Sequence, residues 1–414
     1  MSTTIRKIHA VDRRFTLKPG AGSDAVHTNP SYSYAVTELI SDGDLKGTGI
    51  TLHMGLGNEI ICRAIELLAE ELVGREIEEL MASWGETSHR ISNHPQLRWL
   101  GPHKGVVGLA LSSISNACFD LWAKARNVPL WKLLLDLTPE QFVALLDLSY
   151  LEDVLTKEEA IAILRNQQST RHEREGILLR GYPGYDTSVG WFNYTDDMIR
   201  ENVKKATAEG FTAMKLKVGS KEAERDLRRA RIIRETAGEK AIIMVDANQQ
   251  WTLPQALRIG LELIKVVNPF WIEEPTHPDD IIAHQTLARA LYPTQIALGE
   301  HVSNRVLFKN FLQAGAMQVC QVDATRVAGV DEFLTVSLMA RKFNVRLVPH
   351  IGDMGQIHQH LVFVNHIAMG HEALFLEYIP HLRDYFINPA RVSAGVYHAP
   401  QDAGLSCDLV SEGR

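Results

Sequence analysis

The sequence has few cysteines and no close pair of them. Its 414 residues include four, none of them in a CxxC motif: Cys62, Cys118, Cys320 and Cys407. This wide spacing argues against a zinc site and against a disulfide framework, and it is typical of reduced thiols in a cytoplasm. We therefore expect a cytoplasmic protein.

The sequence also has no excess of basic over acidic residues. The formal net charge is -7, which argues against nucleic acid as a partner, because proteins that bind it carry a basic stripe. We find no run of 18 apolar residues and expect no membrane partner. The opening stretch, MSTTIRKIHAVDRRF, carries charges where a signal peptide needs an apolar segment.

The first 140 residues have a mixed pattern. Residues 3–16 and 32–40 alternate between apolar and polar side chains, which predicts strands of an antiparallel sheet. A helical period covers residues 58–74. Residues 105–135 are mostly apolar on a helical period that Pro129 interrupts, which predicts a long buried helix and a short second one.

From about residue 180, short apolar runs alternate with amphipathic stretches. This alternation is typical of βα units and of a parallel sheet. The runs number eight: GYPGYDTS, AMKLKV, AIIMVDA, PFWIEEP, QIALGEH, MQVCQVD, VRLVPH and LFLEYI. Eight strands favour a closed (β/α) barrel of the TIM type, and no GxGxxG follows any of them, which argues against a dinucleotide-binding fold.

Seven of these runs end in a polar residue that the apolar body of the strand does not predict. The steps between successive residues are 23 to 29 positions, about one βα unit. In a parallel barrel all carboxyl ends lie on one rim, where the active sites of such barrels are found. The residues that we expect to converge there are Lys217, Asp246, Glu273, Glu300, Asp323, His350 and Glu377.

Three consecutive strand ends are carboxylates, Asp246, Glu273 and Glu300. Without a cation they would repel one another, and an all-oxygen ligand set selects a hard divalent ion, Mg²⁺ before others. The alternative is an acid cluster that pairs with arginines or with Lys215 and Lys217. We take the metal site as the hypothesis.

Lys215 and Lys217 lie two apart on one strand and so share a face. Met214, Leu216 and Val218 fill the opposite face, so both lysines point into the barrel or its mouth. A cation nearby and burial would lower the pKa of Lys217 and make it a general base. Lys215, which lies deeper, is expected to contact a substrate carboxylate.

His350 lies across the predicted barrel from Lys217, and Asp323 ends the preceding strand. A carboxylate in this place orients a catalytic histidine, so we expect an Asp323–His350 pair that acts as an acid. His358 and His360 raise the question of a second metal site. At i, i+2 on a helix they do not share a face, which favours two helix-surface residues instead.

The motifs KLKVG, VDANQQW, WIEEPTHPDD, GEHVSNR, QVDATRVAGV and VPH stand in an order that resembles the enolase superfamily, in its mandelate-racemase-like branch. GSDA at 22–25, QLRWLGPHKGV at 96–106, DLTPEQFV at 136–143 and YDTSVGW at 185–191 are most similar to the L-fuconate and L-galactonate dehydratases. The likeness covers nearly the whole chain.

This resemblance implies a capping domain at 1–140, completed by about 381–414, and a barrel at 141–380. It implies Mg²⁺ on Asp246, Glu273 and Glu300, Lys217 as base with Lys215 beside it, and the Asp323–His350 pair as the second acid/base, in keeping with the Lys or His bases of this superfamily. The branch commonly forms symmetric homo-oligomers. The implied substrate contacts are Ser23, Asp24, Asn248, Glu274, His301 and Glu377.

The reaction so implied is dehydration of a sugar acid. The proton alpha to the carboxylate is removed, the 3-hydroxyl is eliminated, and a 2-keto-3-deoxy sugar acid forms. An epimerase or racemase would use the same metal and the same Lys/His pair, so the constellation does not fix the outcome. A non-catalytic barrel is the third hypothesis, although it predicts the loss of a metal ligand or of both bases, and none is lost.

Several positions depart from the pattern of the dehydratases. The loop after His350 is IGDMGQIHQH, with Asp353, where the relatives have a glycine-rich form. Leu56 stands where arginine is usual, Asp186 where threonine is expected and Pro380 where aspartate is expected. Two such changes, an added acid and a lost cation near the pocket, would disfavour a second anionic group on the substrate.

Overall fold

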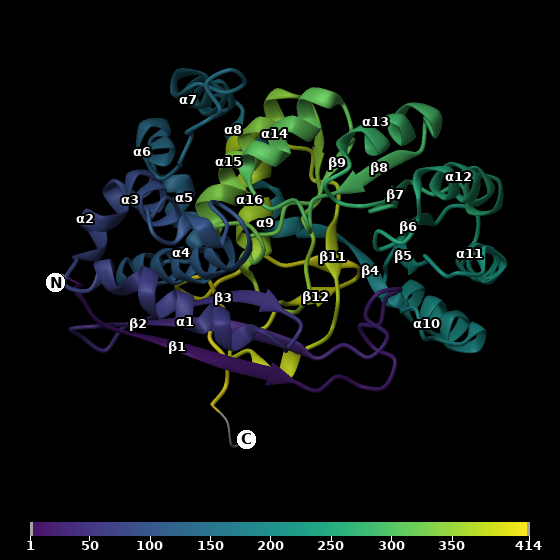
Figure 1. Cartoon of the computed structure of the whole chain (residues 1–414), viewed down its shortest axis with the longest axis horizontal. Helices are drawn as coiled ribbons and strands as arrows, with labels where there is room; N and C mark the ends of the chain where they lie inside the picture. The colour runs from purple at the N-terminus through teal and green to yellow at the C-terminus, as the bar shows by residue number, and fades with distance from the viewer. Residues whose placement is uncertain (1–2, 412–414) are drawn as a thin grey trace.

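An antiparallel sheet of three strands begins the chain in the computed structural model, which describes residues 3–411 (Figure 1). Its order is β1 (Ile5–Phe15), β2 (Tyr32–Ser41) and β3 (Lys46–His53). The sequence predicted the first two strands and missed the third. Gly47 and Gly49 lower the strand propensity of β3, but they let it pack directly on a helix, because a Cβ at Gly49 would collide with the backbone of Ser113.

The helix under this sheet is α4 (Gly105–Ala125), and α5 (Leu130–Asp136) follows the predicted break at Pro129. By length and composition α4 is apolar enough to cross a membrane, which corrects our expectation of no such stretch. In the structure, 89% of that stretch is buried within the protein. It serves here as the central core helix of the first half.

Some of the shorter helices pack against α4, and the later ones lead to the second half (Figure 1). The predicted helix at 58–74 is present as a helix and a following 3-10 turn. The elements are α1 (Asn58–Ala69), η1 (Glu70–Leu72), α2 (Ile77–Ala82), α3 (Trp84–Ser92), η2 (Arg98–Leu100), α6 (Pro139–Ala144), α7 (Lys157–Gln168), α8 (Arg171–Glu175) and α9 (Ile177–Arg180).

The eight predicted strands are all present and parallel, in the spatial order β10-β9-β8-β7-β6-β5-β4, with β11 on the other side of β4. Within residues 3–411 no backbone ladder joins β10 to β11. Between the ends of these two strands, the backbone N of Ile351 donates to the side chain of Glu377, with 3.2 Å from N to Oε2. The strands are β4 (Tyr182–Gly190), β5 (Ala213–Lys217), β6 (Ile242–Asp246), β7 (Trp271–Glu273), β8 (Gln295–Leu298), β9 (Val319–Cys320), β10 (Arg346–Leu347) and β11 (Leu376–Tyr378).

One helix follows each strand from β4 to β10 and covers the outside of the barrel. These helices are α10 (Asp196–Ala208), α11 (Ala223–Ala237), α12 (Leu253–Val267), α13 (Ile281–Ala290), α14 (Arg305–Ala314), α15 (Val330–Lys342) and α16 (Ile357–Met369). Inside the strands a small aromatic and aliphatic cluster fills the space, so the barrel is a packed core and the open face lies at the strand ends. Tyr185 and Trp271 form an edge-to-face pair in it, with ring centres 5.5 Å apart.

The C-terminal segment contacts both halves. It contains η3 (Arg383–Tyr385), β12 (Val392–Ser393) and β13 (Val396–Tyr397), and β13 pairs with β4 of the barrel. Further on, Leu405 N donates to Asp120 of α4. These contacts fit a capping domain completed by the end of the chain, while the boundaries at 140 and 380 stay predictions.

Candidate active site

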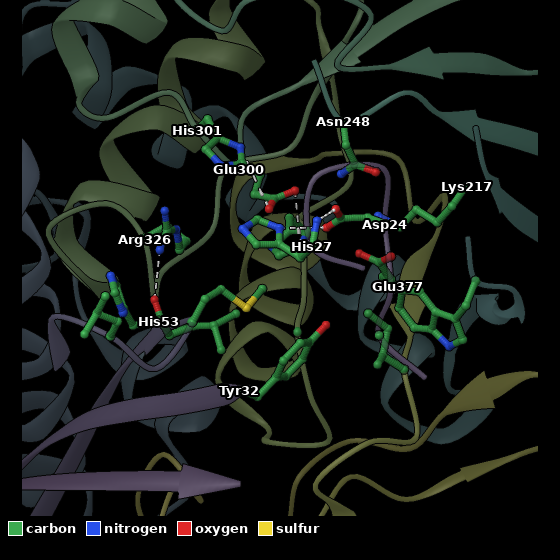
Figure 2. A pocket seen from close by; sticks show the side chains of 18 residues that line it. Asp24, His27, Tyr32, His53, Lys217, Asn248, Glu300, His301, Arg326 and Glu377 are labelled. Carbon is green, nitrogen blue, oxygen red and sulfur yellow. Dashed lines mark hydrogen bonds and ion pairs between the residues drawn. The ribbon is translucent and has the colours of Figure 1, made fainter. Parts of the chain in front are cut away.

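A cavity of about 370 Å³ lies between the capping sheet and the carboxyl ends of the barrel strands (Figure 2). The loops at 22–25 and 55–58 contribute Gly22, Asp24 and Leu56 to its wall. The capping half contributes Asp24, His27, Tyr32, His53 and Leu56. The barrel contributes Trp191, Lys217, Asn248, Glu300, His301, Arg326, His350 and Glu377.

Lys217 and Lys215 both point into the barrel, but only Lys217 lines the cavity. Lys217 Nζ lies 2.5 Å from Asp246 Oδ2, which stands opposite it in the register of β5 and β6. Burial lowers the pKa of Lys217, but the carboxylates of Asp246, Asp24 and Glu273 together outweigh it, so this pKa is raised. Burial raises the pKa of Asp246, but Lys217 and Lys215 together lower it to about 2.

Lys215 is fully buried and lies among acids, which corrects the expectation that it contacts substrate. Its Nζ lies 2.7 Å from Glu273 Oε1 and 2.7 Å from Glu377 Oε1. Its ammonium also stands over the Tyr185 ring, 5.5 Å from the centre. Lys215 therefore holds the acids of the barrel floor in place.

Glu273 is buried, as Asp246 is, and several donors hold its carboxylate. Besides Lys215, its Oε2 accepts from Trp271 Nε1 at 3.0 Å and from Gln321 Nε2 at 2.8 Å. Burial raises the pKa of Glu273 to about 8, against the opposing effect of Lys215. Asp246 and Glu273 are thus paired with lysines, which is the arrangement expected under the alternative to a metal site.

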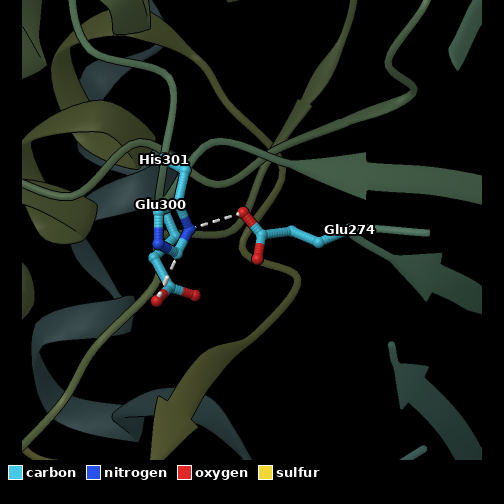
Figure 3. Close-up of side chains that lie close together, drawn as sticks. All are labelled: Glu274, Glu300 and His301. Atoms are coloured by element: carbon cyan, nitrogen blue, oxygen red, sulfur yellow. Dashed lines mark hydrogen bonds and ion pairs between the residues drawn. The ribbon is translucent and has the colours of Figure 1, made fainter. Parts of the chain in front are cut away.

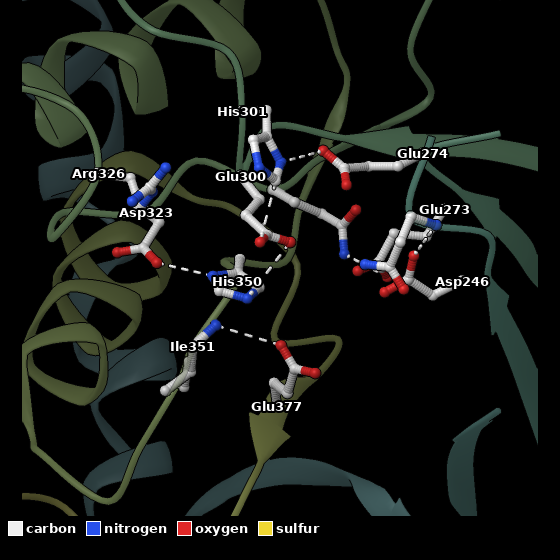
Figure 4. Close-up of polar contacts among 12 residues, drawn as sticks. Asp246, Glu273, Glu274, Glu300, His301, Asp323, Arg326, His350, Ile351 and Glu377 are labelled. Carbon is white, nitrogen blue, oxygen red and sulfur yellow. Dashed lines mark hydrogen bonds and ion pairs between the residues drawn. The ribbon is translucent and has the colours of Figure 1, made fainter. Parts of the chain in front are cut away.

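Glu300 differs from both because, among the described residues, its ion-pair partners are the histidines His301 and His350 and not a lysine (Figure 4). Its Oε2 is buried and accepts no hydrogen bond within residues 3–411, although His350 Nε2 lies 3.4 Å away. A buried carboxylate oxygen without a donor is a position that a hard cation can fill. By their chemistry the carboxylates of Asp246, Glu273 and Glu300 suit Mg²⁺, and Glu300 is the one of the three that lines the cavity.

A second cluster lies beside Glu300 (Figure 3). Glu274, Glu300 and His301 each place one donor atom within 4.8 Å of the others, whereas the predicted trio forms no such group among the described residues. His301 Nδ1 lies 2.8 Å from Glu274 Oε1, and Gln249 Nε2 donates to Glu274 at 2.7 Å. Burial lowers the pKa of His301, but Glu274 and Glu300 raise it to about 9. Glu274 therefore orients His301 and does not itself line the cavity.

The predicted pair of Asp323 and His350 is present. His350 Nδ1 lies 2.7 Å from Asp323 Oδ2, and its Nε2 faces Glu300 and the cavity (Figure 4). Burial lowers the pKa of His350, but Glu300 and Asp323 raise it to about 10. The imidazole is thus held in its protonated form, as an acid must be.

His358 and His360 are not helix-surface residues, contrary to our interpretation. Both lie in α16 and are at most 4% exposed. His358 Nε2 lies 2.9 Å from Asp323 Oδ1, and His360 Nδ1 accepts from Trp131 N at 3.1 Å. The i, i+2 spacing showed only that the two histidines do not share a helix face, but nearly all of α16 is buried, so both faces are covered.

The remaining predicted substrate contacts divide into two groups. Asp24, Asn248, His301 and Glu377 line the cavity. Ser23 does not, because its hydroxyl donates to Gly20 O at 2.7 Å and accepts from Asn193 N at 3.0 Å, and so fixes the loop. Among the departures from the family, Leu56 lines the cavity and is 86% exposed.

The acids that depart from the family pattern lie elsewhere than predicted. Asp353 is buried, contacts the Tyr34 hydroxyl of β2 and accepts from Gly355 N at 2.6 Å. Asp186 is buried in β4 and accepts from Ser188 N at 2.6 Å. Neither lines the cavity, so the lost cation at Leu56 is the change in charge that a substrate would meet.

Sequence reasoning missed His27, Tyr32, His53 and Arg326 on the cavity wall. His27 Nδ1 lies 3.1 Å from Asp24 Oδ2, and Arg326 donates to Leu52 O at 2.9 Å. The available signal for His27 was its place three residues after Asp24, an expected substrate contact. The other three depend on how β2 and β3 approach the barrel, which no local pattern reveals.

The fold and the site together define a barrel enzyme whose cavity faces a lysine, a histidine and a carboxylate. Residues 6–134 match the mandelate racemase / muconate lactonizing enzyme N-terminal domain, and residues 198–413 match the enolase C-terminal domain-like family. The chain therefore belongs to the enolase superfamily, in the mandelate racemase branch.

Its similarity to individual proteins extends over the full length. Human mitochondrial enolase superfamily member 1 has a crystal structure with a TM-score of 0.95, 39% identity and coverage of 99% of this chain and 95% of that one. L-galactonate dehydratase of Hypocrea jecorina is 40% identical over 99% of this chain and 92% of its own length. A mutant L-talarate/galactarate dehydratase, liganded with Mg and L-glucarate, has a TM-score of 0.77 and 25% identity, over 99% of this chain and 91% of that one.

Proposed function

We propose that this protein is a Mg²⁺-dependent sugar-acid dehydratase that acts on an aldonate of the L-galactonate and L-fuconate type, in the cytoplasm. The observation that carries the proposal is the placement of Lys217, His350 and Glu300 on the wall of one cavity, with Asp323 bonded to His350 from behind. The names of two dehydratase relatives support the same class of reaction. A symmetric homo-oligomer is proposed on family resemblance alone.

Asp246, Glu273 and Glu300 would hold the metal. When bound, Mg²⁺ would supply the positive charge that stabilises the dianion formed when a proton leaves the carbon next to a carboxylate. Lys217 reaches the cavity from β5 and takes the C2 proton. For this it must be neutral, which burial favours once Asp246 no longer neutralises the ammonium.

His350 completes the elimination. Its Nδ1 is fixed by Asp323, so Nε2 carries the proton that faces the cavity. Transfer of this proton to the 3-hydroxyl lets it leave as water while the C3–O bond breaks. The resulting enol takes a proton at C3 and becomes the 2-keto-3-deoxy sugar acid, so the net change is the loss of one water.

The charge around the cavity favours a substrate with one carboxylate. Leu56 places an exposed apolar side chain at the mouth where the dehydratases usually have arginine. Arg326 is the guanidinium that lines the cavity, and it is tied to Leu52 O. A chain of hydroxyl groups fits beside His27, Tyr32 and His53 better than a second carboxylate does.

Epimerisation or racemisation is the second candidate, and a specific observation favours it. Lys217 and His350 both line the cavity, from β5 and from the end of β10, so two groups can exchange a proton with the substrate. A non-catalytic role would require a lost base or ligand, and all of the predicted ones are present.

A screen of aldonic and aldaric acids with Mg²⁺ in D₂O tests the proposal. Formation of a 2-keto-3-deoxy acid from L-galactonate or L-fuconate supports dehydration. Deuterium entry at C2 without a keto acid supports epimerisation. No keto acid and no exchange from any acid, in protein shown to bind Mg²⁺, would favour a non-catalytic role.

A further inference from the structure

Both oxygens of the Asp323 carboxylate are held by imidazoles. Oδ2 lies 2.7 Å from His350 Nδ1, and Oδ1 lies 2.9 Å from His358 Nε2. Asp323 is fully buried and His358 is 4% exposed. The proposed mechanism uses His350 and Asp323 and gives His358 no part.

The two histidines come from the two ends of one segment. His350 follows β10, and His358 is the second residue of α16. The loop between them is the one that departs from the glycine-rich form of the relatives, and it bends at Asp353 and Met354. A single carboxylate from the neighbouring β9 loop therefore holds both ends of this loop.

His358 contacts Asp323 from outside the turn that carries this carboxylate, and its Nε2 also lies 3.1 Å from the backbone N of Ala324. Oδ1 also accepts from Thr325 N at 2.6 Å and from Thr325 Oγ1 at 2.7 Å, both on the same short turn as Asp323. Those local bonds move with the turn. His358 instead belongs to the buried helix α16, and its imidazole ring packs edge-on against Phe333. His358 thus ties the carboxylate to the rigid outer layer of the barrel.

We propose that His358 is a positioning residue, which through Asp323 fixes the His350 ring in the orientation that delivers a proton to the leaving hydroxyl. The inference rests on the proposed dehydration for its kinetic consequence. Rotation of the carboxylate about its Cβ–Cγ bond would carry Oδ2 away from His350 Nδ1, and the His358 contact opposes that rotation. Lys217 lies on another strand, so the removal of the C2 proton does not depend on His358.

The test compares elimination with C2-proton exchange in H358F, H358Q and the matched control H360F. Phenylalanine keeps the ring but cannot bond Asp323, and glutamine can place an amide N–H near the position of Nε2. His360 is a buried histidine of the same helix that does not contact Asp323. The H360F variant therefore measures how much the loss of any buried imidazole from α16 lowers the two rates.

We expect H358F to lower kcat for keto-acid formation about 10- to 100-fold, as loss of an orienting partner does. KM and the rate of deuterium exchange at C2 should stay within about threefold, because Lys217 is untouched. H358Q should recover most of the lost rate, and H360F should leave the ratio of elimination to exchange unchanged. Equal loss of both rates in H358F, or no loss, would overturn the proposal.

A crystal structure of H358F gives a readout that needs no activity. The His350 ring should leave the orientation in which Nδ1 meets Asp323 Oδ2, and an unchanged ring would overturn the inference. If wild-type protein neither exchanges C2 protons nor forms a keto acid, the proposed function fails, while the structural result still decides the role of His358. If H358F does not fold, the same structural and kinetic comparison of H358Q with H358L decides it.

Discussion

Lys217 and Asp246 stand opposite each other in neighbouring strands, with Nζ 2.5 Å from Oδ2. The proposed base and a proposed metal ligand therefore neutralise each other when no cation is bound. Since a carboxylate that coordinates a cation no longer neutralises the ammonium to the same extent, metal binding and the activation of Lys217 are linked. Metal binding and proton removal are linked in this way, but they reside on different side chains, so mutation can separate them.

Replacement of Lys217 by alanine should abolish turnover without loss of metal binding. A general base contributes about 10²–10⁴-fold, so kcat should fall by about a thousandfold. The affinity for Mg²⁺ should be unchanged or higher, because Asp246 loses its competing ammonium. Steady-state kinetics and calorimetry measure the two effects, and weaker Mg²⁺ binding in K217A would contradict the account.

Replacement of Glu300 by glutamine should weaken Mg²⁺ binding at least about tenfold, because a neutral amide oxygen is a poorer ligand for a hard cation. The melting temperature should change little, since Glu300 Oε2 accepts no hydrogen bond within the described residues. The control is E274Q, which disturbs the contact with His301 but removes none of the three proposed ligands. A greater loss of Mg²⁺ affinity in E274Q than in E300Q would place the ion in the neighbouring cluster instead.

Replacement of Leu56 by arginine should shift preference toward diacids. A guanidinium at the mouth of the cavity can bond a second carboxylate, and a charge-assisted bond contributes about 1.5–3 kcal/mol, or roughly tenfold or more in relative kcat/KM. The ratio of kcat/KM for galactarate to that for L-galactonate measures the shift, with L56Q as the uncharged control. Equal ratios in both variants would show that charge at this position does not select the substrate.

Asp186 should make the stability of the protein depend on pH. Burial raises the pKa of Asp186 to about 7, and the Ser188 N–H offsets this only in part. The folded state therefore keeps a proton that the unfolded chain releases near pH 4, so stability falls as pH rises from about 4 to 7. Between pH 5 and pH 8 this loss is about 3 kcal/mol.

The variant D186N lacks this titration and should gain stability relative to wild type as pH rises through that window. Urea unfolding at pH 5 and at pH 8 measures it. The difference in unfolding free energy between D186N and wild type should be larger at pH 8. A difference that does not vary with pH would mean that Asp186 is ionised in the folded protein throughout.

The barrel strands and the residues at their ends were predictable from sequence, because parallel strands are apolar on both faces and a polar residue at the end stands out. Lys217, Glu300 and His350 on the cavity wall follow from that rule alone. The missed strand β3 is the opposite case. Its glycines are explained by close packing against α4, whereas local strand propensity argues against them.

The partners of the site residues were harder to predict. The sequence shows that Lys215 shares a strand face with Lys217, and for this reason Lys215 was expected to reach the substrate. Its contacts with three acids depend on how deep each side chain lies in the barrel, which the sequence does not show. His358 was assigned to a surface because helical period does not reveal that α16 is packed on all sides. His27 and Arg326 reach the cavity only through tertiary contacts between the two halves.

The most direct test of the account is anomalous diffraction from a crystal soaked with Mn²⁺, a hard ion that takes the same oxygen ligands as Mg²⁺. The account predicts one peak within about 2.3 Å of a carboxylate oxygen from each of Asp246, Glu273 and Glu300, with Lys217 displaced from Asp246. A peak held instead by Glu274, Glu300 and His301, or no peak near Asp246, would contradict it.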